Sequence, residues 1–143
     1  MCAFCVVPFT RGRERSQRSA ENLSAHLNLF LNDAKQNISQ VADNLSQLDH
    51  LDPQSAIALL DNAREHFPIY TRVTLATPQG KTFAASPVRG PDGTLTPLNT
   101  DISDRIYFRE AMRTGQPVLD RTVIIGLTTG VATAITSAPV FDK

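Results

Sequence analysis

Residues 69–86 read IYTRVTLATPQGKTFAAS, and this stretch decides the fold class. β-Branched and apolar residues stand on both sides of the PQG sequence, a pattern typical of a turn between two strands. We therefore expect a β-hairpin with strands near Ile69–Thr77 and Lys81–Ala85. Two further strand-like runs, residues 118–125 and 131–140, are joined by a GLTTG sequence. The four runs predict a meander of antiparallel strands.

The residues before the hairpin follow a helical period instead. Apolar residues recur at spacings of three and four between residues 23 and 48, which predicts one helix from Ser19 to Asp49. Such a helix would be about 46 Å long, more than a small domain needs for its own core. We therefore expect part of this apolar seam to contact a partner helix. Asp52 and Pro53 predict the N-cap and first residue of a second helix, which ends before Pro68.

A loop and a short helix separate the two pairs of predicted strands. Residues 86–102 are rich in Pro, Gly, Asn and Asp, which indicates a long surface loop. The sequence SDRIYFREAMRTGQPV then begins at Ser103, the predicted N-cap of a short helix that TGQP ends. Helices grouped on an antiparallel sheet predict an α+β fold.

The N-terminus is apolar but too short to span a membrane. Its sequence MCAFCVVPF is about half of the ~20 residues that a bilayer requires. We interpret residues 1–18 as either a poorly ordered tail or the stub of a membrane helix, and residues 19–143 as the folded domain. Cys2 and Cys5 form an isolated CxxC without a second ligand pair, which does not indicate a metal or redox site.

Composition and motifs argue against several classes of function. The chain has 14 basic and 14 acidic residues, so it has no general attraction to nucleic acid. No motif for nucleophilic, phosphate-binding or metal-dependent chemistry is present. The histidines at positions 26, 50 and 66 are far apart on predicted helices and are interpreted as solvated surface residues. We expect a non-enzyme with no catalytic residue, no metal and no cofactor.

The densest cluster of aromatic and cationic residues opens the short helix. The guanidinium of Arg105 is suited to bind a carboxylate through two hydrogen bonds, and Tyr107 offers a ring and a hydroxyl. Beside a concave sheet these two residues predict a pocket wall for a small carboxylate or zwitterion. In the alternative interpretation, Tyr107 and Phe108 fill the core while Arg105 pairs at the surface with Asp101 or Asp104.

Two segments together resemble the Cache family of sensor domains. One is the DR-x-YF-xx-A sequence at residues 104–111, and the other is the later pattern of Thr129, Gly130, Pro139 and Val140. The resemblance covers roughly residues 20–143. It implies a PAS-like fold with a central antiparallel sheet, a long N-terminal helix and a pocket over one sheet face. The chain ends where this fold would have one more strand, so we expect a truncated domain that lacks its last strand.

The resemblance also implies a location and a site. Cache domains lie on the extracytoplasmic, periplasmic side of the bacterial inner membrane, and a membrane tether is expected outside this chain. They bind small metabolites and control a kinase, a cyclic-dinucleotide enzyme or a chemotaxis output. Carried over, the ligand-binding residues are the short-helix pair, two at the start of the third strand and two on the first: Arg105, Tyr107, Asp120, Arg121, Tyr70 and Arg72. The chain contains no Trp, so the amino-acid-binding motif of one branch is incomplete.

The sequence thus predicts a small-molecule-sensing domain of a transmembrane signalling receptor, namely a histidine kinase, a diguanylate cyclase or a chemoreceptor. It would form a homodimer through the long helix and bind no nucleic acid. The alternative is a cytosolic PAS-like interaction module that dimerises through residues 23–48 and binds no small molecule.

Overall fold

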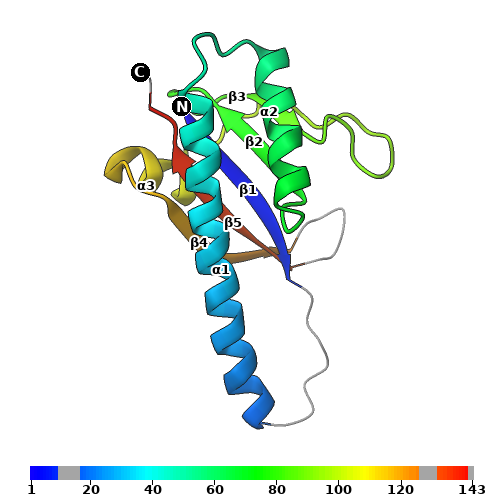
Figure 1. Cartoon of the computed structure of the whole chain (residues 1–143), viewed down its shortest axis with the longest axis vertical. Coiled ribbons are helices and arrows are strands. Elements are labelled where there is room, and N and C mark those ends of the chain that lie inside the picture. Colours follow the sequence, from blue (N-terminus) through cyan, green and yellow to red (C-terminus); the bar gives the residue numbers. More distant parts are fainter. Residues whose placement is uncertain (10–16, 126–131, 142–143) are drawn as a thin grey trace.

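The computed structural model describes residues 1–9, 17–125 and 132–141, and these residues form one antiparallel sheet with helices on both faces (Figure 1). In chain order the elements are β1 (Cys2–Phe9), α1 (Gln17–Ser46), α2 (Pro53–His66), β2 (Arg72–Ala76), β3 (Thr82–Ser86), α3 (Ile106–Thr114), β4 (Val118–Ile125) and β5 (Ala132–Pro139). The strand order is β3-β2-β1-β5-β4. The α+β class and the antiparallel sheet that the sequence predicted are therefore confirmed.

The N-terminal apolar stretch is a strand in the middle of this sheet. Its assignment to a tail or to the stub of a membrane helix is wrong, because β1 pairs with β2 on one side and with β5 on the other. Cys2, Ala3 and Phe4 are all buried. A strand covered on both faces needs apolar residues without alternation, and such a run has no periodicity that separates it from a short apolar helix.

The position of β1 also corrects the expected order of the elements. The two hairpins, β2–β3 and β4–β5, are joined through β1 into one five-stranded sheet whose outer strands are β3 and β4. The long helix α1 is the second element of the chain and not the first. None of the helices in the described residues has both the length and the apolar character needed to cross a membrane.

Helices α1 and α2 cover one face of the sheet. The C-terminal half of the α1 seam packs into the domain's own core, while its N-terminal part extends past the end of the sheet (Figure 1). The buried seam residues are Leu31, Ala34, Ile38, Val41 and Leu45. The side chains of Leu23 and Leu27 lie outside the described residues. Asp52 caps α2 as predicted by accepting a hydrogen bond from the Ser55 backbone N–H, with Pro53 as the first helical residue.

The hairpin β2–β3 turns at a glycine that no other residue would replace easily. Gly80 has a φ of 84°, and a Cβ added there would lie 2.8 Å from the Cα of Ser103. Its carbonyl also accepts a hydrogen bond from the Ile102 N–H. The turn is therefore fixed by the loop that approaches it, not only by its own sequence.

Helix α3 lies on the opposite face of the sheet, and its start differs from the expectation. The helix begins at Ile106, with Arg105 at the N-cap position and no side-chain cap. Ser103 does not cap it, because both its N–H and its hydroxyl donate to Asp101 Oδ1, at 2.9 and 2.6 Å. Local hydrogen bonds of Ser and Asp compete with capping in this way. The core accordingly forms two clusters, one under α1 and α2 and one under α3.

Candidate functional site

The two predicted ligand-binding residues near β2 lie apart from the short helix. Tyr70 is only 2% exposed and belongs to the cluster under α1 and α2. Its hydroxyl donates to the Ala34 carbonyl of α1 at 2.6 Å, so it anchors the helix to the sheet. Arg72, the first residue of β2, is exposed.

Arg105 and Tyr107 point to different environments. Tyr107 is buried under α3, where its ring centroid lies 5.1 Å from that of Phe4. Burial raises the pKa of Tyr107 to about 12, an effect that the positive charge of Arg105 partly offsets. The Arg105 side chain is 57% exposed, and its Nε lies 3.7 Å from Asp104 Oδ1. This geometry corresponds to the alternative of a core tyrosine beside a surface ion pair.

The two candidates on β4 add little to this arrangement. Asp120 is half-buried, and its charge contributes to the raised pKa of Tyr107. The side chain of Arg121 lies outside the described residues. The structure thus brings Tyr107 near Arg105 and Asp120, but it places Tyr70 on the other face of the sheet. The described residues therefore do not form one pocket that contains all six predicted ligand-binding residues.

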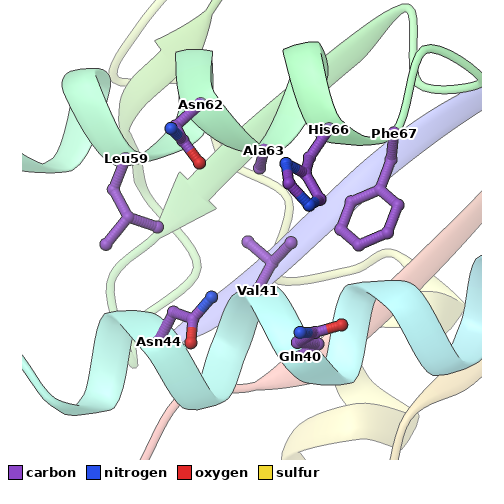
Figure 2. Close-up of a pocket in the computed structure, with 8 residues that line it drawn as sticks. All are labelled: Gln40, Val41, Asn44, Leu59, Asn62, Ala63, His66 and Phe67. Atoms are coloured by element: carbon purple, nitrogen blue, oxygen red, sulfur yellow. The ribbon is translucent and has the colours of Figure 1, made fainter.

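A groove of about 330 Å³ lies elsewhere, between α1 and α2 (Figure 2). Its buried floor is formed by Val41 of α1 and Ala63 of α2. Four exposed polar side chains and two partly buried apolar ones form the walls: Gln40 and Asn44 from α1, and Leu59, Asn62, His66 and Phe67 from α2 and the residue after it. The ring of Phe67 packs edge-on against His66, with centroids 5.7 Å apart.

The polar groups of this groove have spare hydrogen-bonding capacity. Gln40 and Asn44 are four residues apart on α1, as are Asn62 and His66 on α2, so each pair lies on one helix face. None of these four side chains hydrogen-bonds to another residue in the part of the chain that the structure describes. None of the described residues that line the groove is an Asp, Glu, Lys or Arg. The arrangement is suited to bind a polar, uncharged molecule.

The sequence alone does not reveal this groove, because its walls come from two separate helices. His66 was interpreted as a solvated surface residue, and it is exposed, yet it stands at the rim beside an apolar floor. The available signal was the four-residue spacing of amides directly beside the apolar seam. That signal alone does not show which second helix faces it.

A partly buried polar link involves the same C-terminal half of α2. The Ser86 hydroxyl, which is fully buried, donates to Asp61 and accepts from Arg64 Nη1 at 3.2 Å. The Nε of Arg64 is buried and has no hydrogen-bond partner among the described atoms. This cluster joins α2 to the end of β3, and we assign it a structural role.

The two cysteines do not form a visible site. Cys2 is buried, and this burial raises the pKa of its thiol to about 12, which disfavours the thiolate that metal binding requires. The side chain of Cys5 lies outside the described residues. Among the residues that are described, no three His, Cys, Asp or Glu side chains gather in a way that would hold a metal ion.

Comparison with known proteins gives one partial similarity. The chain matches no known family model and no solved structure. It is 36% identical over 89 residues to the tRNA-2-methylthio-N(6)-dimethylallyladenosine synthase of Chlorobium phaeobacteroides (strain DSM 266 / SMG 266 / 2430). The matched part is 60% of this chain and 19% of that protein. The chain therefore spans about a fifth of the length of this relative.

Proposed function

We propose that this chain is a small-molecule-sensing domain whose ligand binds in the groove between α1 and α2. The observation that carries the proposal is the convergence of four polar side chains, without protein partners, on an apolar floor beside α1. Following the resemblance to Cache domains, we place the domain on the extracytoplasmic side of a bacterial membrane, as part of a signalling receptor.

The lining of the groove favours a neutral ligand. Carboxamides donate and accept hydrogen bonds at the same time, and they pair well with amides and with nitrogen heterocycles. The apolar floor of Val41 and Ala63 suits the flat face of a ring. A volume of about 330 Å³ is at the small end of ligand pockets, so a single ring system fits best. The carboxylate ligand predicted around Arg105 is less suited to this groove, because its described lining contains no Lys or Arg.

The same helix offers a route for the signal. A ligand that bridges Asn44 and Asn62 would favour an arrangement in which α1 and α2 lie closer together. A ligand shifts such an equilibrium only by its difference in affinity for the two arrangements. Because α1 extends past the sheet, a small change at the groove moves its far end, where we expect contact with a second copy (Figure 1).

A thermal-shift screen tests the proposal. Neutral amides, nucleobases and sugars are compared with carboxylates and amines on wild type, Asn62→Ala and Arg105→Ala. A ligand at 100 times its dissociation constant stabilises by about 2.7 kcal/mol, or roughly 8 °C for a domain of this size. The matched control is Gln36→Ala, an exposed amide on α1 outside the groove.

Three outcomes distinguish the possible sites. A neutral ligand whose stabilisation is lost in Asn62→Ala and kept in Gln36→Ala and Arg105→Ala supports the groove. A ligand whose stabilisation is lost only in Arg105→Ala refutes the groove as the binding site and indicates a site under α3. No stabilisation by any compound, with a cooperatively folded protein, favours the dimerisation module without a ligand.

The partial relative favours a second candidate function. Similarity to a protein named as a tRNA-modifying synthase suggests a part in tRNA modification. Against this, the chain has a formal net charge of +0, which gives no general attraction to RNA. A mobility-shift assay with bulk tRNA decides: salt-sensitive binding at micromolar protein supports this candidate, and its absence removes it.

A further inference from the structure

The groove between α1 and α2 holds its polar and apolar side chains in separate zones. Two polar side chains stand on each wall, and the wall on α1 faces the wall on α2 across the floor (Figure 2). Asn44 lies opposite Asn62, and Gln40 lies opposite His66. On each helix the two polar residues are separated by about 6 Å along the axis. The groove therefore presents hydrogen-bonding groups along both of its long sides.

The two ends of the groove are apolar. Leu59 and Phe67 are partly buried, and they lie at opposite ends of the groove (Figure 2). The Phe67 ring packs against two other rings, with its centroid 5.7 Å from that of His66 and 5.9 Å from that of Tyr70. An apolar end offers no hydrogen bond, so a hydroxyl group that faced it would lose a bond to water without replacement.

A ligand that matches these zones is polar along two opposite edges, apolar at both ends, and flat where it meets the floor of Val41 and Ala63. A purine base has this distribution of polar atoms. In adenine, ring nitrogens and the amino group lie along one long edge, ring nitrogens lie along the other, and a C–H group stands at each end. Carboxamides both donate and accept hydrogen bonds, so they pair with the donors and acceptors of such edges.

Other neutral molecules match the groove less well. A sugar carries hydroxyl groups around its whole perimeter, so it would direct some of them at Leu59 and Phe67, where they have no partner. A small acyclic amide is polar at one end only, and it would leave the polar groups of one wall without a hydrogen bond to the ligand. These classes of ligand therefore differ in where their polar atoms stand.

We propose that the groove binds a purine base, which lies flat on the apolar floor with one long edge toward α1 and the other toward α2. The inference rests on the proposed ligand groove, and it goes further by naming the class of ligand and by assigning specificity to both walls. Asn44 and Asn62 bind near one end of the ring system, and Gln40 and His66 bind near the other.

Equilibrium dialysis of the full chain against adenine tests the inference. Indole is the matched ligand, because it has a similar fused shape but a single N–H group. We expect adenine to bind at least about tenfold more tightly than indole, because indole lacks hydrogen bonds to one wall. Asn44→Ala and Asn62→Ala change one exposed residue on each wall, and each should weaken adenine binding by about fivefold. Gln36→Ala, an exposed amide on α1 outside the groove, should leave adenine binding unchanged.

The outcomes separate this inference from the proposed function. Adenine that binds no more tightly than indole, or whose binding is weakened by only one of the two wall variants, overturns the purine site. Binding of glucose or acetamide that is lost in Asn62→Ala and kept in Gln36→Ala, without binding of adenine, also overturns it but keeps the groove as a ligand site. If no compound of the thermal-shift screen binds, or if adenine binding is lost only in Arg105→Ala, the proposed groove itself is refuted together with this inference.

Discussion

Replacing Phe4 by Ala gives the most direct test of the central position of β1. Phe4 is 7% exposed and packs in the cluster under α3, with its ring centroid 5.1 Å from that of Tyr107. Truncation of a buried phenylalanine removes its transfer free energy and leaves a cavity that the sheet cannot close, which costs about 3–5 kcal/mol. The free energy of unfolding of domains of this size is about 5–15 kcal/mol, so the variant would lose a large part of its stability.

Urea unfolding at a fixed protein concentration measures this loss. The chain has no Trp, so far-UV circular dichroism and tyrosine fluorescence are the two probes. With a slope of about 1–3 kcal/mol per molar urea, a loss of 3 kcal/mol lowers the midpoint by at least about 1 M. Coincidence of the two probes shows that the transition remains two-state.

The control is the same change at an exposed position. Phe30 on α1 is 40% exposed, so Phe30→Ala should lower stability by less than about 1 kcal/mol in the monomeric unit. If residues 1–9 were a tail, Phe4→Ala would leave the midpoint unchanged, and the reasoning that places β1 between β2 and β5 would fail. If Phe4→Ala and Phe30→Ala lowered the stability by similar amounts, this would instead indicate that a partner buries Phe30.

Three other changes test particular contacts. Tyr70→Phe removes the hydrogen bond to the Ala34 carbonyl without opening a cavity and should cost about 0.5–1.5 kcal/mol in urea unfolding; no change would mean that this bond does not hold α1. Gly80→Ala meets a positive φ and the Ser103 backbone, so we expect a loss of about 1–3 kcal/mol, whereas a neutral result would show that the turn relaxes freely. The hydrogen bonds from Ser103 lower the pKa of Asp101 to about 2, and Lys81 is a smaller cause. Ionised Asp101 therefore stabilises the fold above its ordinary pKa of 3.8, and this contribution is lost as the pH falls toward 2. Thermal midpoints measured from pH 5 to pH 2 should therefore fall more steeply in wild type than in Asp101→Asn, and parallel curves would contradict this assignment.

The candidate site shows how a residue pattern limits a prediction. Arg105 and Tyr107 are two residues apart at the start of a helix, and the pattern permitted either a pocket wall or a core residue beside a surface ion pair. The outcome depends on Phe4, which packs against Tyr107 from a strand a hundred residues earlier in the chain. The groove is similar, because its floor joins Val41 to Ala63 across two helices whose sequences show nothing of their mutual orientation.

Local features of this protein were determined by the sequence alone. The apolar period identified α1, the pair Asp52 and Pro53 identified the start of α2, and the β-branched runs around PQG identified the hairpin. Each of these signals involves residues within one or two turns of each other. Caps, turns and amphipathic faces depend on interactions between residues that are close in sequence, so they can be identified without knowledge of the rest of the chain.

The tertiary structure alone decided the place of β1, the separation of the predicted site residues and the groove between α1 and α2. A continuous apolar run such as CAFCVVPF reports that both of its faces will be buried, but it does not identify what buries them. That choice depends on free edges offered by β2 and β5, which lie about 70 and 130 residues further along the chain. Burial is a property of a segment together with its long-range partners, and those partners become defined only when the sheet assembles.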